Sequence, residues 1–194
     1  MSVTRILHAV RVLGYTGTAR AAERSGLPVE EAEELLLDAQ SRGQVIWTHF
    51  ADEGGWSMTE AGRSYGERLL AAELDSAGAR PLVESVLDGF GPLNDLVTAA
   101  CTRWQLTELG IAASPAALPE VLADLTRAAQ ELARIEECLT AQLGRFAGYH
   151  ARFAAAVDRA PEDPRWVTAT DRDSAHRVWF ELHEDLLATL GRTR

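Results

Sequence analysis

The stretch RGQVIWTHFADEGGWSMTEAGR, residues 42–63, decides the fold. Its early part, residues 44–50, is rich in β-branched and aromatic side chains, which favour an extended strand. Residues 51–55 have the composition of a turn, and residues 56–59 fit a short return strand, so the stretch predicts a β-hairpin. Thr59 then stands where the N-cap of a following helix is expected.

Three short helices are expected before this hairpin, because apolar side chains repeat at intervals of three and four residues and glycine or proline separates the runs. The expected helices are residues 3–13, 18–25 and 29–42. On the first helix, the spacing places Arg5, His8 and Arg11 on the outward face. Thr18 is expected to cap the second helix.

The order of these elements resembles the winged helix-turn-helix domain of bacterial transcription regulators of the MarR and PadR kind. The resemblance covers about residues 3–75. It is carried by Gly26-Leu27 in the turn, by Arg42-Gly43-Gln44-Val45 before the hairpin, and by Trp56-Ser57-Met58-Thr59-Glu60-Ala61-Gly62-Arg63 after it. The resemblance implies a mainly α fold, with a winged helix-turn-helix domain at residues 1–78 that binds DNA and an all-helical domain at residues 79–194.

The second half is expected to be almost wholly helical. The expected helices are residues 79–87, 93–106, 118–143, 145–159 and 174–190, with a break at residues 89–92 and a linker at residues 107–114. Apolar side chains recur in fours and threes from Leu118 to Leu143, about three heptads. Two interpretations of this stripe stay open, the core of an intrachain helical bundle or a dimer interface.

Parts of this half also resemble an uncharacterised set of actinobacterial proteins labelled as transcription regulators, in which a winged helix is joined to a helical domain. The matching segments are Leu93-Asn94, Cys101-Thr102-Arg103-Trp104-Gln105 and residues 173–186. This resemblance implies a fold and a regulatory role, and it implies little chemistry.

In a helix-turn-helix protein the third helix reads the major groove through its N-terminal and outward-facing side chains. Arginines on the second helix, after the third helix and at the base of the hairpin are expected near the phosphate backbone. The candidate DNA-binding residues are therefore Arg20, Arg24, Val29, Glu30, Glu33, Arg42 and Arg63.

The net charge of residues 1–80 opposes strong attraction to phosphate. The third helix carries four glutamates and Asp38, and residues 1–80 contain twelve acidic residues against eight arginines. The expected hairpin tip, residues 52–55, has no arginine to enter a minor groove. Two functions therefore stay open: a transcriptional regulator that binds double-stranded DNA as a homodimer, or a winged-helix module that binds another protein.

A regulator needs an input, and the second half places aromatic and hydrogen-bonding side chains where its helices are expected to face one another. This composition is typical of small-molecule sites, although it also occurs in packed cores. The candidate effector-binding residues are Asn94, Trp104, Gln105, Tyr149, His176, Trp179 and His183. Arg103 and Arg145 are expected to form surface salt bridges.

The chain has 194 residues, 29 of them acidic and 19 basic, for a formal charge of -10. This charge opposes a general polyanion binder. The sequence contains neither an apolar run of about 18 residues nor a signal-like N-terminus, so a cytoplasmic protein without membrane contact is expected. It also lacks the common catalytic and phosphate-binding motifs, and no enzyme activity, metal or cofactor is expected. Cys101 and Cys138 are expected to be buried or idle thiols.

Overall fold

A computed structural model describes residues 2–50 and 53–192, which form two compact units. The first unit comprises residues 2–76 and 187–192, and the second comprises residues 77–186. The structure is mainly helical with a small three-stranded antiparallel sheet, which confirms the predicted fold class at this level. The expected second domain extended to the end of the chain, whereas the last described residues belong to the first unit.

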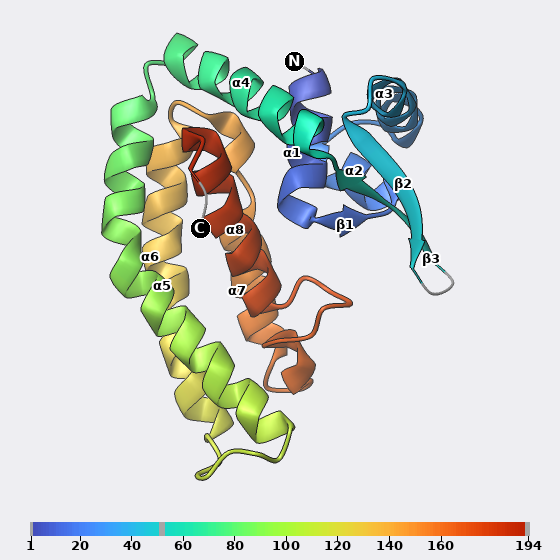
Figure 1. Cartoon of the computed structure of the whole chain (residues 1–194). Helices are drawn as coiled ribbons and strands as arrows, with labels where there is room; N and C mark the ends of the chain where they lie inside the picture. The colour runs from blue at the N-terminus through green and yellow to red at the C-terminus, as the bar shows by residue number, and fades with distance from the viewer. Residues whose placement is uncertain (1, 51–52, 193–194) are drawn as a thin grey trace. The chain divides into compact units, whose positions relative to one another are not determined.

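The first unit contains the whole sheet (Figure 1). Its elements are α1 (Ser2–Leu13), β1 (Tyr15–Thr16), α2 (Thr18–Ser25), α3 (Val29–Ser41), β2 (Val45–Phe50), β3 (Glu53–Met58) and α4 (Glu60–Ser76). The strand order is β1-β3-β2, and Trp47 lies opposite Trp56 in the β2–β3 register. The predicted hairpin is therefore confirmed, but its predicted bounds are wrong, because β3 begins at Glu53, inside the expected turn of residues 51–55, and ends at Met58. β1 is an additional strand in a segment where only a break was expected.

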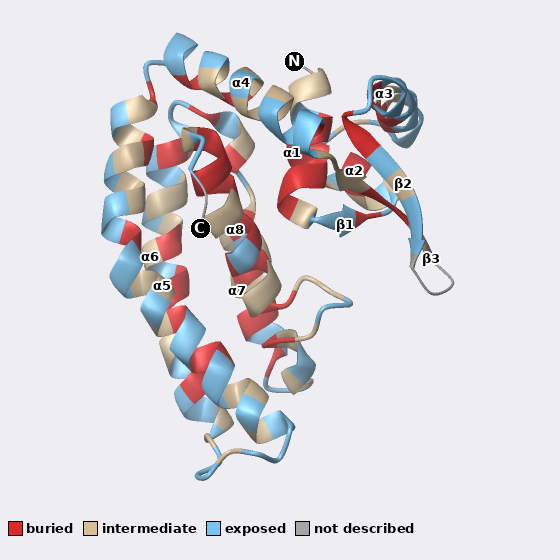
Figure 2. Ribbon diagram, viewed as in Figure 1, coloured by how far each residue is buried: buried red, intermediate tan, exposed pale blue. Residues whose placement is uncertain are grey.

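The core of the first unit joins α1, α2 and α3 to the sheet, and Figure 2 shows buried residues on each of these helices. Ile6, Leu36 and Trp56 belong to this core. The Trp56 indole N–H donates a hydrogen bond to the Thr18 hydroxyl at 3.0 Å. The prediction that Thr18 caps α2 is wrong, because Gly17 occupies the N-cap and Thr18 is the first helical residue.

His8 and Arg11 are buried, so the prediction that they face outward from α1 is wrong. The reason is that α4 packs against α1 and covers these side chains. Arg11 is paired there with Glu67 of α4, at 3.2 Å. Arg5 is exposed as predicted, and its guanidinium donates to the Gly26 carbonyl.

The second unit is built from helices, and α5 and α6 run antiparallel beside each other (Figure 1). Its elements are α5 (Arg80–Glu108), α6 (Leu118–Thr140), η1 (Gly144–Phe146), α7 (Tyr149–Arg159), η2 (Pro164–Trp166) and α8 (Ala175–Leu190), whose last residues belong to the first unit. A single helix was expected over residues 145–159. Gly148, with a φ of +95°, instead separates η1 from α7.

The predicted break at residues 89–92 is wrong, because α5 continues through it. Phe90 is buried and its ring stacks on that of Trp179, with the ring centroids 4.9 Å apart. This packing stabilises the helix, although Pro92 cannot donate the usual backbone hydrogen bond. Likewise, α5 extends to Glu108, into the segment predicted to be a linker.

The apolar stripe of α6 packs inside the second unit. Leu125, Leu132 and Leu139 are all buried within the single chain. This burial confirms the interpretation of the stripe as an intrachain core at these positions. Within the part of the chain that the structure describes, no helix combines the length and apolar character required to cross a membrane.

Candidate functional site

A tight turn between α2 and α3 positions α3 at the surface of the first unit. Gly26 adopts the left-handed conformation with a φ of +64°, and the Leu27 amide donates to the Ala22 carbonyl at 3.1 Å. Ala32 and Leu36 of α3 then face the core. The opposite face of α3 is exposed to solvent.

This exposed surface, which we call the α3 face, carries both acidic and apolar side chains. Its exposed residues are Val29, Glu30, Glu33, Glu34, Leu37 and Asp38. The three predicted base-reading residues therefore lie on one accessible helix. The four carboxylates among these residues give the α3 face a negative charge, which repels phosphate.

Arg20 and Arg42, which are predicted to contact phosphate, already have carboxylate partners. Arg20 of α2 pairs with Glu23 at 2.8 Å, and Arg42 pairs with Asp38 at 2.7 Å. Exposed pairs of this kind contribute only about 0–1 kcal/mol, so a phosphate can replace the carboxylate at small cost. Arg24 is partly buried and lies one helical turn from Arg20 on α2.

The junction between the hairpin and α4 brings the start of α4 against the start of β2. The Thr59 amide donates to the Gln44 carbonyl at 3.1 Å, and the Gly62 amide donates to the Thr59 hydroxyl at 3.0 Å. Thr59 is therefore the N-cap of α4, as predicted. A Cβ atom on Gly62 would lie 1.8 Å from the Gln44 carbonyl oxygen, so only glycine fits. Arg42 and the exposed Arg63 flank this contact in the sequence.

Of the predicted hairpin tip, residues 52–55, Asp52 lies outside the described residues. Gly55 is in β3, where a Cβ atom would lie 2.5 Å from the ring of Tyr15. The Tyr15 hydroxyl donates to the Thr48 carbonyl at 2.9 Å. Tyr15 thus fastens the hairpin to β1, a role that the sequence analysis missed because a two-residue strand has no detectable periodicity.

Four aromatic or polar residues meet in the second unit, three of them predicted effector ligands. The Trp179 indole N–H donates to the Asn94 side-chain oxygen at 3.2 Å. The ring of Phe90 stacks on Trp179 and lies 5.3 Å from that of His183. These side chains pack directly against one another, as expected if this composition belongs to a packed core and not to a small-molecule site.

The other predicted effector residues are distributed over separate places. Trp104 and Gln105 are half-buried near the end of α5, and the buried Trp104 indole nitrogen has no hydrogen-bond partner in the part of the chain that the structure describes. His176, also half-buried, donates through its backbone amide to the Val167 carbonyl at 2.9 Å. The remaining residue, Tyr149, belongs to a buried network of charged groups.

This network centres on Asp185, whose side chain is 0% exposed. Arg145 pairs with one Asp185 oxygen at 2.5 Å, and the Tyr149 hydroxyl donates to the other at 2.9 Å. Arg145 is only 11% exposed, so the prediction that it forms a surface salt bridge is wrong. Arg103 does form one, with Asp124.

Arg152 joins a second set of acids beside Tyr149. It donates to Asp173 at 2.7 Å and to the buried Glu181 at 2.6 Å. Burial alone would lower the pKa of Arg152, but the hydrogen bond to Asp173 and the charge of Glu181 raise it overall. These closely paired groups cross-link α7 to the segments around α8 and point to a structural role.

The cysteines differ in environment. Cys101 is buried, and burial raises the pKa of its thiol to about 12, which makes it a poor nucleophile at neutral pH. Cys138 is exposed on α6. Across residues 2–50 and 53–192, no three His, Cys, Asp or Glu side chains are arranged to hold a metal ion.

Comparison with known proteins gives no relative: neither a family model, nor a curated protein, nor a solved structure matches this chain.

Proposed function

We propose that the protein is a DNA-binding transcriptional regulator and that its first unit is a winged helix-turn-helix domain. The observation that carries this proposal is the order α1-β1-α2-α3-β2-β3, with a tight turn before α3 and the α3 face exposed. In that arrangement α3 enters the major groove and the β2–β3 hairpin is the wing. The proposed activity involves no catalytic step and no cofactor, and it places the protein in the cytoplasm with the chromosome.

The side chains have different tasks in this proposal. Val29, Glu30 and Glu33 face base edges, where a glutamate can accept a hydrogen bond from cytosine N4 and valine can contact a thymine methyl group. Arg20, Arg24, Arg42 and Arg63 contact phosphates, which requires the exchange of Glu23 and Asp38 for phosphate oxygens.

The acidic α3 face has a consequence for specificity. Attraction to phosphate supplies most of the non-specific affinity of DNA-binding proteins, and the carboxylates of this face reduce it. Binding then depends strongly on correct base contacts. A protein of this kind has low affinity for arbitrary DNA and a large ratio between specific and non-specific affinity.

Two further features belong to the proposal. Recognition of palindromic half-sites calls for a homodimer, since the symmetry of the protein must match that of the DNA. A small-molecule effector would act through the second unit, where Trp104 has a buried indole N–H that a ligand can use. Such a ligand would shift the spacing of two α3 helices in the dimer.

A second candidate function is supported by the composition of the α3 face. Exposed Val29 and Leu37 lie among carboxylates, and the nearby Arg20 and Arg42 are held by acids. A basic protein segment with apolar side chains would fit this surface better than a polyanion does. In that case the protein is an interaction module without DNA affinity.

Replacing Arg20 and Arg24 together by alanine is expected to weaken binding to a selected genomic fragment at least about tenfold. Two phosphate contacts are lost in each protomer, four in the dimer, so the slope of log affinity against log salt should become shallower by about four. Gel shifts at several salt concentrations measure both quantities.

Arg165→Ala is the matched control, because Arg165 is an exposed arginine of the second unit with one carboxylate partner, Asp163. It should leave the affinity unchanged. Equal losses in the two variants, or an unaltered salt slope in the α2 variant, would contradict the assigned phosphate contacts.

A further inference from the structure

The β2–β3 hairpin, which is the wing in the proposed function, contains neither arginine nor lysine. Residues 45–58 contain a single side chain that can gain a positive charge near neutral pH, His49 of β2. The other ionisable residues of this segment are two acids, Asp52 and Glu53. The attraction that the hairpin offers to phosphate therefore depends on whether His49 is protonated.

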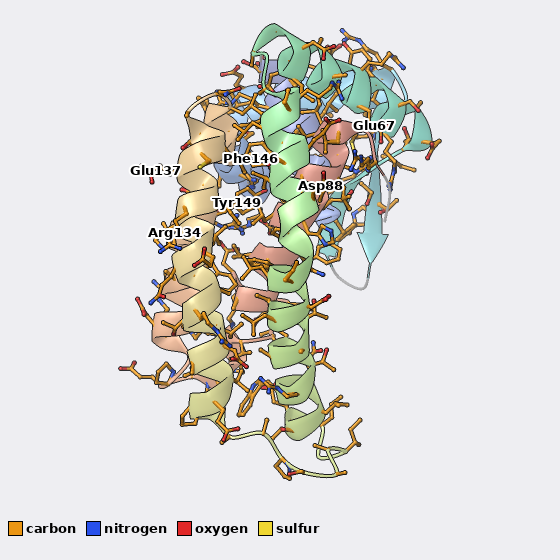
Figure 3. All side chains as sticks on the ribbon, turned by 90° about the vertical axis from the view of Figure 1, so that its left-hand side faces the viewer. Glu67, Asp88, Arg134, Glu137, Phe146 and Tyr149 are labelled. Atoms are coloured by element: carbon orange, nitrogen blue, oxygen red, sulfur yellow. The ribbon has the colours of Figure 1, made fainter. Side chains whose placement is uncertain are left out.

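His49 lies near the free end of the hairpin. It is the residue before the last one of β2, and in the β2–β3 register it lies opposite Gly54. The side chain of His49 is exposed. Figure 1 and Figure 3 show the hairpin extending beyond the helices of the first unit. The imidazole is therefore accessible to a molecule that contacts this end of the hairpin.

A row of aromatic rings holds the imidazole of His49 in place. Trp56 belongs to the core of the first unit, and its ring centroid lies 4.9 Å from that of Trp47. The Trp47 ring centroid in turn lies 6.1 Å from that of His49, with the two ring planes at 86°. The row runs from the core towards the free end of β2, so the imidazole is positioned by contacts that begin in the core.

Gly54 completes the surroundings of this row. A Cβ atom on Gly54 would lie 2.2 Å from the Trp47 ring, so a larger residue would displace the indole. Gly54 is also the residue opposite His49, and it has no side chain to pair with the imidazole. The groups that face His49 are thus the Trp47 ring on β2 and the Gly54 backbone on β3, neither of which carries a charge.

We propose that protonation of His49 controls how tightly the wing binds DNA phosphate. The inference rests on the proposed function and adds pH as a regulatory input to the same surface. A charged imidazole donates from both ring nitrogens and forms a charge-assisted hydrogen bond with a phosphate oxygen. Affinity for DNA then rises as the pH falls through the range in which histidine gains its proton.

The size of this effect follows from the linkage between proton binding and DNA binding. A phosphate oxygen beside His49 stabilises the charged imidazole, and by reciprocity the charged imidazole strengthens the binding of DNA. A homodimer has two wings and therefore up to two such protons. Two added positive charges also release about two more counterions, which makes the dependence of affinity on salt steeper.

The test uses a fragment that the full chain selects from genomic DNA at pH 6. Fluorescence anisotropy of this labelled fragment gives the affinity at pH 6 and pH 8, each at several salt concentrations. The wild type should bind at least about tenfold more tightly at pH 6 than at pH 8. Its slope of log affinity against log salt should be steeper by about two at pH 6.

Three variants assign this dependence to one side chain. His49→Gln cannot gain a charge, so it should bind equally at both pH values, with about the affinity of the wild type at pH 8. His49→Arg has a permanent charge, so it should bind equally at both values, with about the affinity of the wild type at pH 6. His150→Gln, at a half-buried position of α7, is the matched control and should keep the dependence of the wild type.

The outcomes separate this inference from the proposed function. Equal affinity of the wild type at both pH values would overturn the inference and leave DNA binding intact. A pH dependence that persists in His49→Gln would also overturn it, because another group would then bind the proton. Selection of no fragment would overturn both. Circular dichroism at pH 6 and pH 8 checks that each variant is folded.

Discussion

Asp185→Ala is expected to lower the free energy of unfolding by about 3–5 kcal/mol. Asp185 is fully buried and accepts from both Arg145 and Tyr149. Its removal takes away the counter-charge of a guanidinium that is itself nearly buried, and an uncompensated buried charge is far more costly than the net value of the pair. Urea denaturation followed by circular dichroism measures the change.

Two variants separate charge from packing in this result. Tyr149→Phe removes the hydroxyl that donates to Asp185 and lies 3.4 Å from the Glu181 carbonyl oxygen, and it should cost about 1 kcal/mol. Arg145→Met combined with Asp185→Leu removes both charges, and its stability should lie closer to that of the wild type than to that of Asp185→Ala. If the double variant is as unstable as Asp185→Ala, the loss comes from shape and not from the unpaired guanidinium.

Gly62→Ala is expected to destabilise the first unit by about 1–3 kcal/mol. The added Cβ atom would lie 1.8 Å from the Gln44 carbonyl oxygen, a backbone atom that also accepts from the Thr59 amide. Either α4 or the start of β2 must move to relieve this overlap. Thermal unfolding and urea denaturation both report the effect.

Gly66→Ala provides the control within the same helix. There the nearest atom to an added Cβ is the Met58 methyl carbon at 3.7 Å, an ordinary contact. Alanine in a helix interior is preferred to glycine by about 0.5–1 kcal/mol, so this variant should be more stable than the wild type. The same sign of change at Gly62 and Gly66 would contradict the close approach of α4 to β2.

The hairpin and its exit were predictable because the sequence signals there are local. Thr59 caps α4 and Gly62 packs against Gln44, which explains the spacing of the motif aromatic-x-x-Thr-x-x-Gly-Arg. The aromatic residue of the motif, Trp56, belongs to the core and bonds to Thr18. Trp56, Thr59 and Gly62 thus each have a contact within the first unit.

Features that depend on contacts distant in the chain were not predictable. The segment GFGP looked like a break, but the stacking of Phe90 on Trp179 keeps it helical. Arg145 was expected at the surface. Its burial depends on Asp185, forty positions later in the chain, which pairs with it. A signal for this was present, since Glu181 and Asp185 fall one turn apart beside apolar positions of α8.

The exposure of the candidate DNA-binding residues could be predicted from the sequence. The ion pairs that surround these residues could not. Val29, Glu30 and Glu33 are exposed, which follows from helical spacing. The ion pairs of Arg20 and Arg42 depend on side-chain geometry that a sequence pattern does not fix. The candidate effector residues were grouped by composition, and the structure distributes them over several packed places.

Selection of genomic fragments by the purified protein, at about 50 and 200 mM salt, tests the proposed function most directly. The proposal predicts recovery of a discrete site with two half-sites, bound more weakly at the higher salt because phosphate contacts release counterions. Recovery of no enriched sequence at either salt would contradict DNA binding and favour the interaction module.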